Sequence, residues 1–176
     1  MQKSTPKKYG AVAVTVHWLT ALLIAGLLIS GNRMDGMADS AAKAQLLMIH
    51  APVGVLIGLL TLFRIFWWWR FDRKPEPVGT TSAWQERAAQ GVHVLFYVVI
   101  LGMAASGIGM MVLSGAGAIL FGGAPAPLPD FGVYPPRTAH GAGAYALAAL
   151  AGLHAAAALY HHLWRRDNTL RAMWFR

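Results

Sequence analysis

The sequence contains no cysteine in its 176 residues. This absence excludes disulfide bonds, iron–sulfur clusters held by thiolates, and the C-x-x-C-H motif that attaches haem covalently. Any cofactor is therefore held by other side chains. Charge is also scarce, because only 12% of the residues are charged, about half the usual share in a soluble domain. Hydrophobic residues, in contrast, make up 56% of the chain.

Apolar runs of membrane-spanning length recur four times, at about residues 11–31, 47–69, 90–113 and 140–163. Each is close to the ~20 residues that a helix needs to cross a bilayer core. The first run has no convincing cleavage motif, so we interpret it as a retained span rather than a removable signal. Membrane spans of this kind are helical. The sequence therefore predicts one all-α domain over residues 1–176, an integral membrane four-helix bundle.

Basic residues are distributed unevenly among the connections. Twelve of the fifteen lie in the N-terminal tail, the 64–87 connection and the C-terminal tail, whereas the other two connections hold Arg33, Lys43 and Arg137. By the positive-inside tendency, both termini are expected in the cytoplasm. Topology and attraction to anionic lipid explain the formal charge of +8, so no nucleic-acid partner is expected.

The seven histidines all lie in the spans or at their edges. A single intramembrane histidine most often forms a hydrogen bond between helices, but five in four helices favour a ligand role. Near the outer surface we expect His50 and His140. Near the inner surface we expect His17, His93 and His154. His154 follows His140 by fourteen residues, which returns it to nearly the same helix face about 21 Å deeper.

Two imidazoles that face each other across a bundle are the axial ligands of a six-coordinate haem iron. At the outer depth the pair is His50 and His140. At the inner depth His17 is the expected partner of His154; His93 is the alternative, and its other role is contact with a propionate or a quinone. The spans contain no acidic residue, which disfavours zinc. The sequence therefore predicts two haems b that carry electrons across the membrane.

Four segments carry a resemblance to a known family: VTVHWL at 14–19, LLMIHAPVG at 46–54, HGAGAYALAALAGLH at 140–154 and GLHAAAALYHHLWRRDNTLRAMW at 152–174. Together they resemble the bacterial cytochrome b561 family, in particular its superoxide oxidase branch. The resemblance implies a four-helix bundle with two haems b in a bacterial inner membrane. Its ligand positions match His17, His50, His140 and His154.

The resemblance also implies ubiquinone as the electron acceptor near the cytoplasmic side. In the family, the first histidine of the terminal pair and a hydroxyl residue two before the first-span ligand lie at the quinone site, and they match His161 and Thr15. His161 is seven residues beyond His154, on nearly the same face and about 10 Å closer to the cytoplasm. A neutral imidazole there can donate to a quinone carbonyl and pass on a proton. Alternatively, His161 is an ordinary polar residue at the membrane interface.

Three cations complete the candidate site. Lys74 can reach the quinone from the cytoplasmic loop, or serve only as a topology signal. Arg64 follows His50 by fourteen residues, so it can face an inner propionate or a quinone, or extend to the interface. Arg137 lies about one turn before His140 and is the candidate for steering superoxide, because the outer connections hold three basic and three acidic residues. Its alternatives are anchoring the fourth span and pairing with a propionate.

The leading hypothesis is an oxidoreductase that passes electrons from superoxide at the outer face to ubiquinone at the cytoplasmic side. The alternative is an electron-carrier subunit docked to a dehydrogenase or another redox partner protein. A haem-free transporter or assembly protein is the third possibility, and a colourless purified protein would indicate it. The Gly- and Pro-rich loop at 114–139 shows no matching motif, and its AILF segment is expected to dip into the interface or to cover something beneath it.

Overall fold

A computed structural model describes residues 2–38, 41–76, 82–123 and 127–175. Four long helices dominate these residues: α1 (Ala11–Asp35), α2 (Ala41–Arg70), α3 (Ala83–Leu113) and α5 (Pro135–Tyr160), which a π-helical turn, η2 (His161–Arg165), extends. By length and composition all four can cross a membrane. The prediction of an all-helical protein with four membrane-capable helices is therefore confirmed.

The helices extend beyond the apolar runs because local signals at their ends favour helix. At the start of α3, the Ser82 side chain accepts from the Gln85 backbone N–H, and the Gln85 side chain accepts in return from the backbone N–H of Ser82. This capping box satisfies two N–H groups that a helix start leaves unpaired. At the start of α5, Pro135 occupies the first turn, where its missing N–H is not needed.

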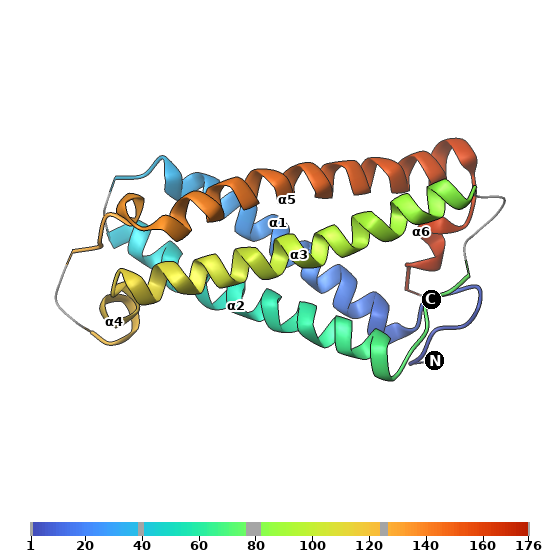
Figure 1. The fold of residues 1–176 in the computed structure, drawn as a ribbon, viewed down its shortest axis with the longest axis horizontal. Coiled ribbons are helices and arrows are strands. Elements are labelled where there is room, and N and C mark those ends of the chain that lie inside the picture. Colours follow the sequence, from blue (N-terminus) through green and yellow to red (C-terminus); the bar gives the residue numbers. More distant parts are fainter. Residues whose placement is uncertain (1, 39–40, 77–81, 124–126, 176) are drawn as a thin grey trace.

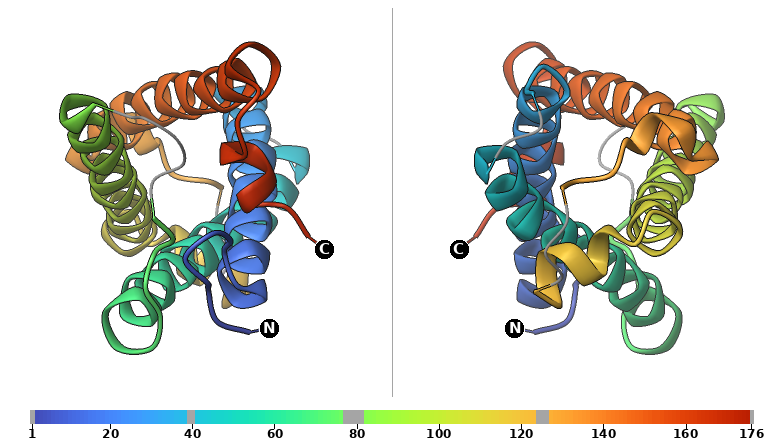
Figure 2. Two further views of the ribbon diagram at one scale, coloured as in Figure 1. Left: turned by 90° about the vertical axis from the view of Figure 1, so that its right-hand side faces the viewer. Right: turned by 90° about the vertical axis from the view of Figure 1, so that its left-hand side faces the viewer.

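The long helices form an antiparallel bundle in which α1 packs on α2, α2 on α3, and α3 on α5. Viewed end-on, they surround a common axis (Figure 2). Among the described residues, the backbones of α1 and α5 do not pack closely against each other. Both ends of the chain lie at one end of the bundle, beside α6 (Thr169–Ala172), which we call the terminal end (Figure 1). The opposite end carries α4 (Ala116–Phe121) and is called the α4 end.

A buried apolar layer crosses the middle of the bundle. Each long helix contributes one residue to it: Ile24, Ile57, Ile100 and Leu147. Each of these residues lies seven positions after a histidine of its own helix, which is about two turns or 10 Å. The layer therefore separates histidines at the terminal end from histidines at the α4 end.

Asp72 ties the N-terminal segment to the end of α2. Its carboxylate accepts from the Ser4 backbone N–H at 3.0 Å, the Ser4 hydroxyl at 2.8 Å and the Trp67 indole N–H at 3.2 Å. Burial acts to raise the pKa of Asp72, but the hydrogen bonds from Ser4, Arg73 and Trp67 outweigh it and lower that pKa. The carboxylate therefore stays ionised and holds the segment in place.

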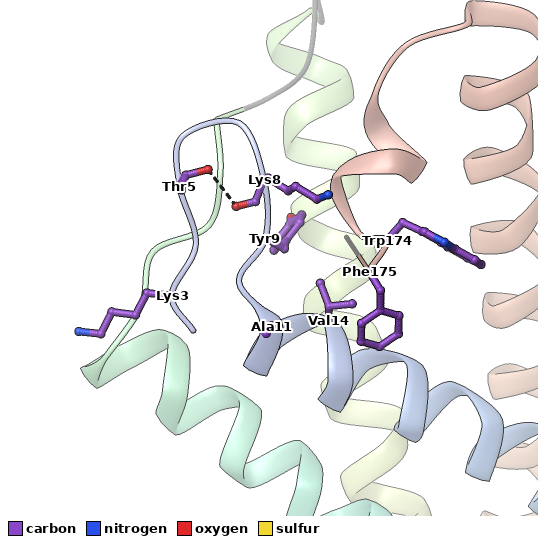
Figure 3. A pocket seen from close by; sticks show the side chains of 8 residues that line it. All are labelled: Lys3, Thr5, Lys8, Tyr9, Ala11, Val14, Trp174 and Phe175. Atoms are coloured by element: carbon purple, nitrogen blue, oxygen red, sulfur yellow. Dashed lines mark hydrogen bonds between the residues drawn. The ribbon is translucent and has the colours of Figure 1, made fainter. Parts of the chain in front are cut away.

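The C-terminal segment closes the same end of the bundle. The backbone N–H of Tyr9 donates to the Ala172 carbonyl at 3.1 Å, and the indole N–H of Trp18 donates to the Met173 carbonyl at 2.8 Å. Figure 3 shows the small pocket between the two chain ends. Its volume is about 160 Å³, and its lining includes Lys8, Tyr9, Val14, Trp174 and Phe175. These contacts cover the terminal end of α1.

Candidate functional site

Two histidines face each other at the α4 end of the bundle. His50 lies on α2 and His140 on α5, and their ring centroids are 6.4 Å apart. A metal–imidazole bond is about 2.0 Å long and the centroid lies about 1.1 Å behind the bonding nitrogen, so one metal between two imidazoles needs about 6.2 Å. The spacing of His50 and His140 therefore fits a single iron between them.

A large cavity surrounds these two rings. Its volume is about 1070 Å³, and residues of all four long helices line it. Ligand pockets in proteins usually measure about 300–1,000 Å³, so this one suits a large planar group. Phe121 of α4 and Phe131 of η1 (Phe131–Val133) also line it, so part of the 114–139 connection covers the cavity as expected. The donor set and the space both fit haem at this end.

A second histidine pair lies nearer the terminal end. The ring centroids of His17 on α1 and His154 on α5 are 6.2 Å apart, which again fits one metal between two imidazoles. His93 on α3 also approaches His154, with centroids 5.8 Å apart. Within the described residues no three His, Asp or Glu side chains converge as a zinc site requires. The geometry favours pairwise ligation, with His17 closer than His93 to the expected spacing.

Arg64 and Trp68, about one turn apart on α2, each have a donor without a hydrogen-bond partner among the described residues. Arg64 Nη1 donates to His17 Nδ1 at 3.3 Å. The Nε of Arg64 and the indole Nε1 of Trp68 are buried, and among the described residues neither has a hydrogen-bond partner. Buried donors without acceptors are costly, so these two groups suit an acceptor such as a carboxylate. A propionate of an inner haem has this chemistry.

His161 forms a close pair with Asp167 at the terminal end. Its Nδ1 donates to Asp167 Oδ2 at 2.6 Å, and both side chains are partly buried. Burial acts to raise the pKa of Asp167, but hydrogen bonds from His161 and Thr169 outweigh it and lower the pKa to about 2. The carboxylate is thus ionised at any working pH.

An irregular backbone brings this pair together. The chain leaves α5 through the π-helical turn η2, and Arg166 then adopts a left-handed conformation with φ 50°. The Asp167 backbone N–H donates to the His161 carbonyl at 3.2 Å, which closes the turn. A non-glycine residue at positive φ is strained by about 1–2 kcal/mol. Such strain and π-turns both concentrate at functional sites.

The other quinone candidates lie at the same end on separate elements. Thr15 is an exposed residue of α1, Lys74 is exposed in the loop after α2, and His162 is half-buried in η2. Among the described residues no hydrogen bond or ion pair joins Thr15 or Lys74 to His161. Partial burial of its side chain and the charge of Arg64 lower the pKa of Lys74, although the residue as a whole is exposed. The structure therefore gathers these residues at one end without placing them in contact.

Arg137 forms an ion pair with Asp35 across the α4 end. Its Nη2 donates to Asp35 Oδ1, which links the start of α5 to the end of α1. Both groups are partly exposed, and Arg137 also lines the large cavity. Of the other outer acidic residues, Asp130 caps η1 and Asp39 lies outside the described residues. The positive charge of Arg137 is therefore partly compensated.

The chain matches the sequence family described as "Prokaryotic cytochrome b561" over residues 8–176. It belongs to the prokaryotic cytochrome b561 family. The resemblance read from the sequence is thus confirmed. Membership implies haem b as cofactor and electron transfer in a bacterial membrane that the chain crosses several times. The histidine pairs and the large cavity suit that chemistry.

Named relatives span nearly the full chain. "Cytochrome b561 homolog 2" of Escherichia coli (strain K12) is 27% identical, covering 97% of this chain and 93% of its own length. "Cytochrome b561 homolog 1" of the same organism is 28% identical over 94% and 96%, respectively. "Probable superoxide oxidase CybB" of Yersinia pestis is 30% identical over 95% and 96%. No solved structure matches the chain.

In this cytochrome b561 chain, the two helical hairpins repeat the same spacing, which sequence reasoning missed. Ser30 follows His17 by thirteen residues, and Ser106 follows His93 by thirteen. Likewise, Arg64 follows His50 by fourteen residues and His154 follows His140 by fourteen. The repeat relates α1 to α3 and α2 to α5. At the inner depth, arginine in one hairpin therefore takes the position that histidine occupies in the other.

Asp167 was also missed, although it lies within the quoted terminal motif. A residue six positions after His161 lies on a different face of a regular helix, so helical spacing gives no signal for this pair. Only the π-turn and the left-handed Arg166 bring the two side chains together.

Proposed function

We propose that this chain is a superoxide:quinone oxidoreductase of the bacterial inner membrane, acting as one membrane domain over residues 1–176. Two superoxide ions are oxidised to molecular oxygen at the α4 end, and one ubiquinone takes up two electrons and two protons at the terminal end. The termini then lie in the cytoplasm and the α4 end faces the periplasm. The main support is that two histidine pairs lie at two depths along α5, His50 with His140 and His17 with His154. The name of the Yersinia pestis relative supports superoxide as the donor.

Bound haem b would supply one-electron redox chemistry at each of two sites. We assign His50 and His140 to the outer site and His17 and His154 to the inner one. The apolar layer of Ile24, Ile57, Ile100 and Leu147 lies between them. Electrons can pass this layer, whereas its four apolar side chains disfavour the passage of ions such as protons and superoxide.

Arg64 would change its partner if His17 held a haem. With one ring nitrogen of His17 on the iron and the hydrogen on the other, Nδ1 would not accept from Arg64. The guanidinium would then be free to pair with a haem propionate, together with the unpaired indole N–H of Trp68. His93, left without a metal in this assignment, remains beside the inner site as a contact for a propionate or the quinone.

His161 and Asp167 would deliver protons to the quinone. Asp167 accepts the hydrogen bond from Nδ1–H of His161, so in the neutral ring Nε2 has no hydrogen and can only accept. His161 can therefore donate to a quinone oxygen only as the imidazolium. This revises the expectation that the neutral ring donates. The imidazolium gives its Nε2 proton to the reduced quinone and is reprotonated from the cytoplasm, while the Asp167 carboxylate holds the ring through Nδ1–H. Thr15 and Lys74 are the proposed further contacts of the quinone.

The proposal is tested by stopped-flow spectroscopy of the purified protein mixed with superoxide and then with ubiquinone. We expect rapid absorbance changes of haem reduction by superoxide, followed by reoxidation on addition of ubiquinone. Reduction by dithionite but not by superoxide would overturn the proposal and favour the electron-carrier alternative. A colourless protein would overturn both.

Substitutions of Arg137 and of Asp35 are expected to change the rate of reduction by superoxide in opposite directions. Arg137→Gln removes a cation that lines the outer cavity and should slow the reduction by superoxide several-fold. Asp35→Asn removes the compensating carboxylate and should increase that rate, most clearly at low ionic strength, because salt screens the attraction. The measurement is the second-order rate constant at several salt concentrations. Equal rates in wild type and both variants would refute steering by Arg137.

A further inference from the structure

Each outer histidine is held by a serine of the neighbouring helix. Ser30 Oγ on α1 lies 2.9 Å from His50 Nδ1, and Ser106 Oγ on α3 lies 2.9 Å from His140 Nδ1. The two contacts occupy equivalent positions of the two hairpins. A repeated contact of the same length in both halves indicates a shared role.

The serine hydroxyls determine the direction of these hydrogen bonds. Ser30 Oγ donates to the Leu27 carbonyl at 3.2 Å, and Ser106 Oγ donates to the Met103 carbonyl at 3.0 Å. A hydroxyl has one hydrogen, so a serine that donates to the carbonyl accepts from its histidine. In this arrangement His50 and His140 carry their hydrogen on Nδ1, and each has its lone pair on Nε2.

Glycines follow both serines and lie beside the Cε1 edge of the rings. A Cβ added at Gly31 would lie 3.4 Å from His50 Cε1, and one added at Gly107 would lie 3.4 Å from His140 Cε1. Both glycines line the large cavity. The Ser-Gly dipeptide thus lets the imidazole ring lie close to the backbone of the neighbouring helix.

We infer that Ser30 and Ser106 are positioning residues that select the metal-binding tautomer of both outer histidines and make Nε2 more electron-rich. The inference rests on the proposed function in taking His50 and His140 as haem ligands. A ligating imidazole that donates its other N–H is a stronger base, which stabilises ferric over ferrous iron. The carbonyls of Leu27 and Met103 strengthen the effect by polarising the two hydroxyls in series.

Among the described residues, no serine hydroxyl bonds to either inner histidine. His17 Nδ1 faces Arg64 Nη1, a donor, at 3.3 Å. The two sites therefore differ in the groups behind their ligands, although all four ligands are histidines. Substituting the serines should change the outer haem and leave the inner haem as an internal standard of correct folding.

The test is potentiometric titration of Ser30→Ala and Ser106→Ala with dithionite as reductant, together with haem content and low-temperature electron paramagnetic resonance. In each variant we expect one of two titrating components to move to higher potential while the other is unchanged. We also expect outer haem binding to weaken about 10- to 100-fold. Ser30→Thr and Ser106→Thr should restore the wild-type titration, because a helical threonine hydroxyl can also bond the preceding turn's carbonyl. Ser114→Ala is the matched control, since the Ser114 hydroxyl at this end bonds the Met110 carbonyl.

An unchanged titration in both alanine variants overturns the inference, as does an equal shift in Ser114→Ala. A wild-type protein that holds a single haem overturns it together with the two-haem assignment. The titration involves no superoxide and no quinone. A failure of superoxide to reduce the protein would therefore refute the proposed function and leave the result on the serines standing.

Discussion

Replacing His140 by alanine is expected to remove the outer haem and leave the inner haem in place, so that haem content falls from two per chain to one. An alanine provides no ligand, and His50 alone cannot form the six-coordinate pair that the 6.4 Å spacing allows. His154→Ala should do the reverse and remove the inner haem. The measurements are haem content after acid–acetone extraction, which should release all haem from a chain without cysteine, and the reduced-minus-oxidised spectrum.

His93→Ala is the matched control for the inner site, because His93 also approaches His154. It should retain two haems, whereas His17→Ala should lose one. The opposite result, with loss in His93→Ala and retention in His17→Ala, would show that the inner pair is His93 and His154. The centroid spacings of 5.8 Å and 6.2 Å favour His17.

Replacing His161 by alanine is expected to slow reoxidation by ubiquinone about 100-fold, while both haems and the rate of reduction by superoxide are retained. The substitution removes the proposed proton donor and headgroup contact but lies seven residues beyond the inner ligand, His154. Asp167→Asn should have a similar effect of about 10-fold or more, because an amide, unlike a carboxylate, does not fix the hydrogen of His161 on Nδ1. The measurement is the reoxidation rate after mixing the reduced protein with ubiquinone.

His162→Ala is the control for this end of the bundle. It removes the adjacent imidazole of η2, whereas the pairing with Asp167 belongs to His161. Reoxidation should therefore stay near the wild-type rate in His162→Ala. If His161→Ala and Asp167→Asn also reoxidise normally, the pair only stabilises the turn, and thermal unfolding of the two variants would then show a loss of stability.

The bundle could be read from the sequence because a bilayer imposes strong constraints on a chain. Four long apolar runs have few alternatives to helices, and the apolar run that suggested a third span at 90–113 corresponds to α3, Ala83–Leu113. Hydropathy did not give the helix ends, because it reports only the apolar part of a helix. Ser82 at the start of α3 and Pro135 at the start of α5 lie outside the apolar runs. Helical periodicity likewise brought His140 and His154 to one face, which the structure shows.

The sequence by itself determined the residue types and their depths: histidines at two levels, no thiol, and no carboxylate within the apolar runs. Depth follows from position along a helix, at about 1.5 Å per residue. Only the tertiary structure decided which groups meet between helices. The Ser30–His50 and Ser106–His140 contacts join separate helices, and the His161–Asp167 pair depends on a π-turn followed by a left-handed residue. Rotation and register of neighbouring helices come from side-chain packing across the whole bundle, which no local spacing encodes.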